Sequence, residues 1–235
     1  MPVLIKKLLR TIRYTLGQFL ASALVIATGI IAFVAMTAVS DNLIRSRDSF
    51  YRETDFADHF FHVVRAPEGI FNRIEAVNGV LRATVRVQKD VSVLSDDGIR
   101  TTLRLTGYPL PADLELSRVK VLEGRMFEKH PEGGTVEVLL NPQFAKAHGL
   151  VPGDTISIAA EGRRKTLTMT GTAAGPEFVY AVKGAASLLE DPSSFGVAIL
   201  PQNQAQQLLA MKGSVNQVLI RFIPGADTAR AVREI

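Results

Sequence analysis

His59 and His62 are the only close pair of histidines in the sequence, and histidine can bind a metal ion or exchange a proton near neutral pH. On a strand their odd separation would point them to opposite faces, whereas on a helix they could share one face. The sequence places no third ligand beside them, and a zinc site needs at least three. We therefore expect partly buried structural histidines and no metal site. His130 and His148 stand alone in the sequence.

Motifs for covalent or nucleotide chemistry are missing from the sequence. The chain has no cysteine, which excludes disulfides, thiolate metal sites and cysteine nucleophiles. It also has no G-x-x-x-x-G-K-[ST] loop, no G-x-G-x-x-G after a predicted strand and no G-x-S-x-G elbow. Asp96 and Asp97 belong to a predicted turn, and Glu190-Asp191-Pro192 to a predicted loop. We therefore expect no catalytic residue, no cofactor and no enzymatic activity in this chain.

Gly153 and Asp154 come directly before a predicted strand that begins at Thr155. A glycine and an aspartate at such a position can form a ligand-binding turn. They can equally form an ordinary turn, because glycine accepts positive φ and aspartate bonds nearby backbone groups. We favour the ordinary turn.

The net charge of +4 has a local origin. Residues 1–40 hold four basic side chains and no acid, which leaves 27 − 4 = 23 basic groups against 23 acids in the rest of the chain. The four basic residues are Lys6, Lys7, Arg10 and Arg13. A charge-balanced domain has no electrostatic footprint for nucleic acid, so we expect none as a partner. The basic stretch precedes an apolar run, where phospholipid headgroups are the natural partner.

Residues 1–17 have the pattern of an amphipathic helix. Lys6, Arg10 and Arg13 recur at i, i+4 and i+7, while leucines and isoleucines fill the opposite face. We favour a helix that lies in the cytoplasmic headgroup layer of a membrane. Alternatively, the segment extends a spanning helix and its lysines snorkel to the interface.

An uncharged run from Phe19 to Val39 predicts a transmembrane helix over residues 18–40. Its 21 residues would span about 31 Å, against a hydrocarbon core of about 30 Å. A cleaved signal peptide is the main alternative, with Ala38-Val39-Ser40 as its cleavage site, but signal peptides have shorter apolar cores. A buried core helix is a weaker alternative, because no charge interrupts the run. The flanking basic residues predict a cytoplasmic N-terminus, with residues 41–235 outside the cytoplasm of a bacterial cell.

The remaining pattern predicts an α+β fold, in which the membrane helix is followed by a two-lobed mixed α/β domain over residues 41–235. The helix should continue as a stalk to about Tyr51. Further strands are expected at Phe56–Val64, Val80–Leu94, Arg100–Thr106, Val136–Leu140, Thr155–Ala160, Lys165–Thr172, Gly196–Leu200 and Val215–Phe222. Helices are expected at Glu68–Val77 after Pro67, at Pro142–His148, at Pro201–Met211 and from Ala226. Asp96-Asp97-Gly98 predicts a hairpin turn, and Glu161-Gly162-Arg163-Arg164 a second one. The region with Pro109, Pro111 and Gly124 reads as loop-rich, and residues 173–194 read as a long loop. The segments from Gly196 to Phe222 read as one strand-helix-strand unit. The last helix has no closing signal before Ile235, so we expect a piece of a longer protein.

The order of these parts resembles the N-terminal part of an ABC-transporter permease of the FtsX/MacB-like class. Short motifs agree, the most specific being Gly175-Pro176-Glu177-Phe178-Val179-Tyr180 followed by Phe195-Gly196-Val197. The others are Val77-Asn78-Gly79-Val80, Thr106-Gly107-Tyr108, Glu123-Gly124-Arg125 and Gly153-Asp154-Thr155-Ile156. The resemblance covers essentially the whole chain.

This resemblance implies a permease subunit that couples a separate cytoplasmic ATPase to an extracytoplasmic domain. It also implies further spanning helices downstream, with the ATPase-contacting loop between them, and a second permease copy as a partner. Members of the class move or extract lipids, lipoproteins, peptides or drugs. The alternative is a single-pass, membrane-anchored extracytoplasmic adaptor or sensor module.

Overall fold

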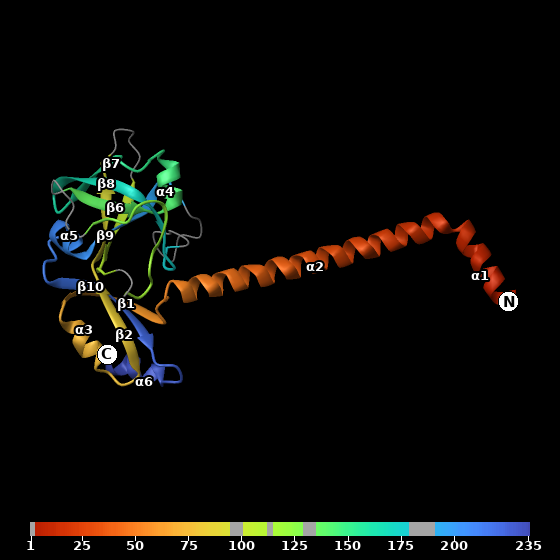
Figure 1. Ribbon diagram of the computed structural model, residues 1–235, viewed down its shortest axis with the longest axis horizontal. Helices are drawn as coiled ribbons and strands as arrows, with labels where there is room; N and C mark the ends of the chain where they lie inside the picture. The colour runs from red at the N-terminus through yellow and green to blue at the C-terminus, as the bar shows by residue number, and fades with distance from the viewer. Residues whose placement is uncertain (1–2, 95–100, 112–114, 129–134, 179–190) are drawn as a thin grey trace. The chain divides into compact units, whose positions relative to one another are not determined.

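The computed structural model describes residues 3–94, 101–111, 115–128, 135–178 and 191–235. The chain divides into two compact units, Met1–Phe50 and Tyr51–Ile235. Figure 1 shows that the first unit is purely helical and that the second contains all the strands.

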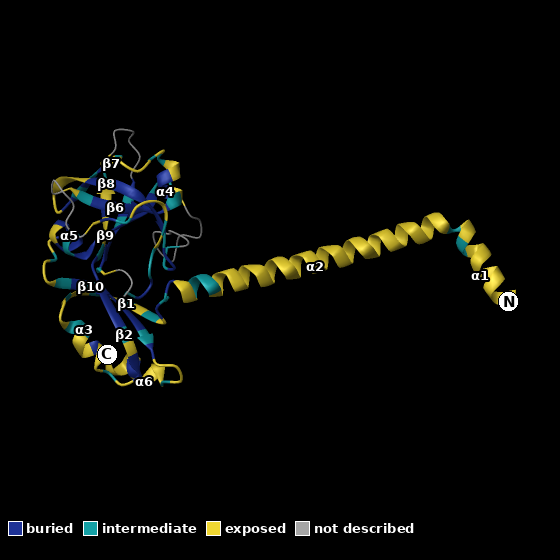
Figure 2. Ribbon diagram, viewed as in Figure 1, coloured by how far each residue is buried: buried dark blue, intermediate teal, exposed yellow. Residues whose placement is uncertain are grey.

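The first unit contains α1 (Val3–Tyr14) and most of α2 (Leu16–Glu53). The two helices are separated at Thr15, so the basic segment is a helix of its own and does not simply extend the apolar one. In α2 the side chains of the apolar run are exposed along its whole length (Figure 2). Thr28 and Thr37 donate their hydroxyls to the carbonyls of Leu24 (2.8 Å) and Phe33 (2.9 Å), which satisfies their polar groups within the helix. Among the described residues, α2 is the one helix long and apolar enough to cross a membrane.

The second unit contains a small three-stranded antiparallel sheet of order β1-β10-β2. Its strands are β1 (His59–Pro67), β2 (Val80–Arg86) and β10 (Ser214–Phe222). Two short helices, α3 (Ile70–Glu75) and α6 (Thr228–Glu234), contribute buried side chains to the core on one face of this sheet. That core includes Ile74, Val85, Val218, Ile220 and Ala231, so the two ends of the outer domain fold together as one lobe.

The middle of the chain forms a second lobe around seven strands of order β5-β8-β6-β9-β4-β3-β7. These are β3 (Gln88–Val93), β4 (Thr102–Tyr108), β5 (Lys120–Gly124), β6 (Val136–Leu140), β7 (Thr155–Ala160), β8 (Arg163–Ala174) and β9 (Phe195–Pro201). Because β7 also pairs with β8, six of the strands close into a barrel and β5 extends it along β8. The helices α4 (Pro142–Ala147) and α5 (Gln202–Leu208) also belong to this lobe.

The barrel has an inner and an outer hydrophobic core, because its strands alternate side chains between two faces. Leu103, Leu105, Val138 and Leu140 belong to the inner core. Leu139, Val197 and Ile199 belong to an outer core that also includes Phe127 and the partly buried Phe178. The segments that cover the barrel from outside are therefore held by apolar contacts as well as by hydrogen bonds.

The α+β class, the long N-terminal helix and the two-lobed domain are confirmed. The strand Val136–Leu140, the helix that begins at Pro142 and the hairpin of β7 and β8 lie where the sequence predicts them. At the tip of that hairpin, Glu161 and Gly162 both have positive φ (48° and 71°), as a tight two-residue turn requires.

Several boundaries were predicted wrongly. The expected strand Val80–Leu94 is two strands, β2 and β3, which join different sheets on either side of Val87. Pro67 ends β1 and does not open a helix, so α3 is shorter than predicted.

The remaining corrections concern sheet membership. Strand β5 lies in a region predicted as loop, because its pairing with β8 comes from tertiary structure. Strands β9 and β10, predicted as one strand-helix-strand unit, belong to different sheets. The predicted turn at Asp96–Gly98 lies outside the described residues, although β3 and β4 do pair as antiparallel neighbours.

Candidate functional site

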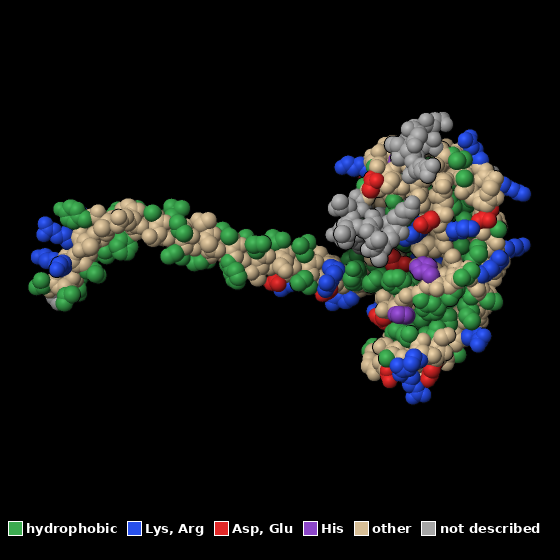
Figure 3. All heavy atoms as spheres, turned by 180° about the vertical axis from the view of Figure 1, so that it is seen from behind, with side chains coloured by type: hydrophobic (Ala, Val, Ile, Leu, Met, Phe, Trp, Pro, Cys, Tyr) green, Lys and Arg blue, Asp and Glu red, His purple; other side chains and the backbone are tan. Residues whose placement is uncertain are grey.

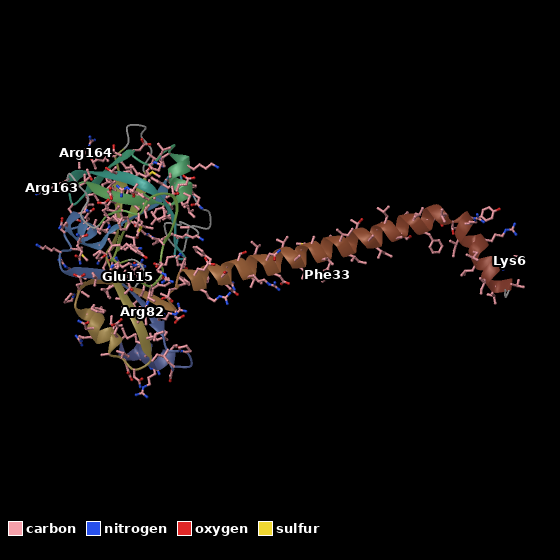
Figure 4. All side chains as sticks on the ribbon, in the orientation of Figure 1. Lys6, Phe33, Arg82, Glu115, Arg163 and Arg164 are labelled. Carbon is pink, nitrogen blue, oxygen red and sulfur yellow. The ribbon has the colours of Figure 1, made fainter. Side chains whose placement is uncertain are left out.

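The four basic residues of the N-terminal segment lie on α1. Lys6, Lys7, Arg10 and Arg13 are all exposed. Figure 3 shows blue side chains gathered at this end of the helical unit, and Figure 4 labels Lys6 among them. At 100° per residue, Lys6, Arg10 and Arg13 fall within about 60° of one another around the helix, so α1 presents one cationic stripe.

A second cluster of charged residues lies on the face of the small sheet that turns away from α3. Alternating positions on β2 and β10 place Arg82, Thr84 and Arg86 beside Arg221, Leu219 and Gln217, because the register pairs them in that order. We call these six residues the polar face. The intervening positions, such as Ala83, Val85, Val218 and Ile220, belong to the hydrophobic core of the opposite face.

The chain that leaves α2 is tied to this polar face. Asp55 has a positive φ of 51° and accepts hydrogen bonds from both Arg221 and Arg82, the latter at 3.3 Å. Arg221 also donates to the carbonyl of Phe56 at 3.1 Å, and Asp58 accepts from the backbone N–H of Phe222 at 2.9 Å. We call residues Thr54–Asp58 the joint, because they connect the end of α2 to the outer domain.

The joint is also held by the segment Glu115–Arg118. The backbone N–H groups of Ser117 and Arg118 donate to the carbonyls of Asp55 (2.9 Å) and Thr54 (2.6 Å). Leu116 packs with Ala57 and Leu219 in a small buried cluster. The joint is therefore bonded both to the polar face and to this segment, which fixes its backbone at several points.

A segment that follows β8 also contacts the polar face. We call this segment, residues Gly175–Phe178, the strap. Glu177 of the strap forms an ion pair with Arg86 and accepts a hydrogen bond from Gln217 Nε2 at 3.3 Å. The side chains of Arg86 and Glu177 are only 1% and 9% exposed. Since Glu177 follows a barrel strand and Arg86 lies on the small sheet, this buried pair links the two lobes.

Glu115 lies close to the same arginines. Its Oε2 accepts a hydrogen bond from Thr84 Oγ1 at 2.8 Å. Burial raises the pKa of Glu115, and the hydrogen bond from Thr84 and the charges of Arg86 and Arg82 oppose that rise only in part. Figure 4 labels Glu115 and Arg82 where the barrel meets the small sheet.

The motif residues singled out from the sequence have different surroundings. Gly175 and Pro176 are buried in the strap beside Glu177, and Tyr180 lies outside the described residues. Gly153 has a φ of 104°, and Asp154 Oδ2 accepts from the backbone N–H of Val151 at 2.9 Å. These are the contacts of a turn before β7.

The histidines of β1 have structural contacts. His62 Nε2 lies 3.0 Å from Gln88 Oε1, and the ring of His59 lies 6.3 Å from that of Phe61. Within the described part of the chain, no three His, Cys, Asp or Glu side chains are grouped so that they could hold a metal ion.

The sequence pattern did not predict the polar face. Its one visible sign is that Arg82, Thr84 and Arg86 alternate with apolar residues along one predicted strand. Which acids would meet these arginines depends on segments that are far apart in the sequence; Asp55 and Arg221 are separated by 166 positions.

An exposed apolar helix of spanning length, followed by a domain with its own hydrophobic cores, is typical of a membrane-anchored globular protein. Residues 19–235 match the family described as the MacB-like periplasmic core domain. This chain belongs to that family, and its outer domain is an extracytoplasmic domain of the FtsX/MacB-like class of ABC-transporter permeases. The domain is of a permease type and is not itself catalytic.

Two extracytoplasmic transporter domains are among the solved structures similar to this chain. One is the extracellular domain of the noncanonic ABC-type transporter YknZ from Gram-positive bacteria, with 13% identity, a TM-score of 0.46, and coverage of 71% of this chain and 78% of that one. The other is the periplasmic region of MacB from Actinobacillus actinomycetemcomitans, with 12% identity, a TM-score of 0.44, and coverage of 71% and 69%. No curated protein sequence matches this chain.

Proposed function

We propose that this chain is part of a permease that couples a separate cytoplasmic ATPase to movement of its extracytoplasmic domain. The observation that carries this proposal is the continuity of α2, which runs without a break from Leu16 to Glu53 and ends one residue before the joint. A continuous helix with a firmly bonded end can transmit a displacement of its membrane segment to the outer domain.

The proposed arrangement places the N-terminus in the cytoplasm. Residues 1–17 lie in the cytoplasmic headgroup layer, residues 18–40 cross the membrane, and residues 41–235 lie outside. The four basic residues of α1 support this orientation, because basic residues next to a spanning helix are retained on the cytoplasmic side. Anionic lipid headgroups would contact the same stripe.

The proposed partners are the lipid bilayer, a separate ABC ATPase and a second permease copy. The ATPase is assigned to another subunit because this sequence has no phosphate-binding loop. Segments of the permease beyond residue 235 would contact it. The transported molecule would be a lipid, lipoprotein, peptide or drug, as in other members of the class.

The rigid-helix proposal can be tested by changing the rotational phase of the stalk. Two alanines inserted after Ser46 would rotate everything beyond them by about 200°, whereas four would rotate it by about 400°, close to the original phase. The full permease and its ATPase are reconstituted in nanodiscs, and ATP turnover is compared with that of the ATPase alone. The four-alanine variant should keep most of the permease-dependent change in turnover, and the two-alanine variant should lose it.

Comparing the two insertions separates the effect of helix rotation from the effect of added length. If the two insertions reduced coupling in proportion to their length, transmission by a rigid helix would be wrong. If the permease left ATP turnover unchanged in every form, the proposed coupling itself would be wrong.

A further inference from the structure

The ion pair between Arg86 and Glu177 is the most buried charged contact among the described ion pairs. A buried charge that loses its partner is strongly unfavourable, so Arg86 needs a carboxylate nearby in every populated state of the domain. In the structure that carboxylate comes from the strap, which is anchored on the barrel through the packing of Phe178 in the outer core.

The hydrogen bonding around this pair is incomplete. Arg86 Nε and Gln217 Oε1 are buried, and among the described residues neither has a hydrogen-bond partner. Buried polar atoms in proteins are usually satisfied, and a partly satisfied polar network is less stable than a complete one. The direct contacts between the strap and the small sheet are therefore the ion pair of Arg86 with Glu177 and the hydrogen bond from Gln217 Nε2 to Glu177.

A second carboxylate is available to Arg86. Glu115 is near enough for the charge of Arg86 to influence its ionisation, and its hydrogen bond with Thr84 fixes it over the same face of the sheet. Thr84 and Arg86 are two residues apart on β2, so their side chains point to the same side. Glu115 also belongs to the segment that holds the joint, whereas Glu177 belongs to the strap.

The two lobes are also joined beside this ion pair. Where β2 passes into β3 at Val87, Asn216 of β10 exchanges two 2.7 Å hydrogen bonds with the backbone of Gln88. These bonds tie the small sheet to the start of β3, and Arg86 lies two residues before Gln88. A contact at that position can set the angle between the lobes.

We propose that Arg86 and Glu177 form a releasable latch that fixes the angle between the small sheet and the barrel, with Glu115 as the second carboxylate that receives Arg86 when the strap leaves. With the latch closed, Arg86 pairs with Glu177 and the strap holds both lobes. With the latch open, Arg86 turns to Glu115 and the lobes rotate about Val87. This inference concerns the outer domain alone and does not depend on coupling to an ATPase.

The test is a distance measurement between the lobes in the full chain. The protein has no cysteine, so Asn72→Cys on α3 and Lys146→Cys on α4 give one spin-label pair without background. Both positions are exposed, and Figure 1 shows the two helices at opposite ends of the outer domain. Double electron–electron resonance in nanodiscs should give one dominant distance for the otherwise unchanged chain.

Two variants should shift the distribution of spin-label distances in opposite directions. Glu177→Gln removes the strap's charge, so a second distance should become dominant. Glu115→Gln removes the alternative partner, so any minor second distance should disappear. Glu161→Gln is the matched control, because it breaks an exposed ion pair with Lys89 within the barrel lobe and should change nothing.

If Glu177→Gln keeps the original distance while the protein melts cooperatively, the latch is wrong. If the second distance of Glu177→Gln persists equally in the Glu177→Gln/Glu115→Gln double variant, Glu115 is not the receiving carboxylate. Should Glu177→Gln fail to fold, Glu177→Asp keeps the charge but shortens the reach, and an unchanged distribution there would also overturn the latch.

Discussion

At the scale of single residues, Gly196 shows how closely the barrel is packed. It lies on β9 under the ring of Phe144 from α4, and a methyl group at that position would overlap the ring. Both residues are buried, so the ring has no open space into which it could turn. The glycine is therefore required by the approach of α4 to the barrel.

We predict that Gly196→Ala lowers the free energy of unfolding by about 1–3 kcal/mol, the usual cost of an overpacked core. Thermal melting followed by circular dichroism measures the effect. Gly69→Ala is the matched control, because Gly69 has a φ of −64° and no atom within 4 Å of the added carbon. Equal melting temperatures for the two variants would contradict the packing argument.

We predict that the free energy of unfolding depends on pH through the ionisation of Glu115. Because burial raises its pKa in the folded state, the folded chain binds this proton more tightly than the unfolded chain. Its contribution to stability is therefore fully present below the ordinary glutamate value of 4.5 and is lost as the pH rises through the raised pKa. Glu115→Gln should increase the free energy of unfolding at neutral pH and flatten its decline above about pH 4.5, measured by urea unfolding across pH.

Asp191 serves as a control, because its pKa is shifted in the opposite direction to that of Glu115. Hydrogen bonds from Ser193 and Ser194 lower the pKa of Asp191. Its contribution is therefore present above the ordinary aspartate value and is lost as the pH falls through the lowered pKa. Asp191→Asn should change the free energy of unfolding only at acidic pH. A Glu115→Gln profile parallel to that of the unchanged protein would contradict the assignment to Glu115.

At the scale of elements, α2 combines two roles in one helix. Its apolar half has the length of a membrane core, and its polar half continues to the joint. No side chain of α2 is fully buried within the structure, so its apolar surface is available to lipid. The ten Phe, Leu, Ile and Val residues between Phe19 and Val39 would contribute on the order of −3 to −6 kcal/mol to membrane insertion.

We predict that Gly29→Arg prevents stable insertion of α2. A charge at the centre of a span costs roughly 2.5–3.5 kcal/mol, which is comparable to the total apolar contribution of the segment. Carbonate extraction of membranes should release the variant. Gly17→Arg, at the start of the same helix, should remain inserted because its side chain can reach the interface. Retention of Gly29→Arg in the extracted membranes would mean that this run is not the anchor.

At the scale of the whole molecule, the family and the single spanning helix place the globular domain outside the cytoplasm. Orientation of the N-terminus remains a prediction from charge. The excess of basic side chains lies entirely before the apolar run, and the rest of the chain is balanced. This distribution favours a cytoplasmic α1.

Cysteine labelling tests that orientation directly. Lys165→Cys, at an exposed position on β8, should react with a membrane-impermeant maleimide in intact spheroplasts. Lys7→Cys on α1 should react only after the inner membrane is broken. The reverse pattern, or labelling of both positions in intact spheroplasts, would refute the proposed topology.

The local features of the chain were predictable from sequence. The apolar run, the basic amphipathic helix, the helix that begins at Pro142 and the hairpin at Glu161-Gly162 each depend on residues within about twenty positions of one another. Helix periodicity, proline at a helix start and glycine in a turn act over such distances. The absence of cysteine and of nucleotide-binding motifs is likewise a property of the sequence alone.

Tertiary structure decided which strands share a sheet and which charges meet. Strands β2 and β3 have the same alternating pattern, yet the chain changes sheets at Val87, which is fully buried in the inner core of the barrel. Strand β5 exists because β8 supplies its hydrogen-bond partners. The ion pairs of Asp55 with Arg221 and of Arg86 with Glu177 join segments 166 and 91 positions apart. A period of two residues fixes the face of each side chain but not the neighbouring strand, so only the folded sheet determines these partners.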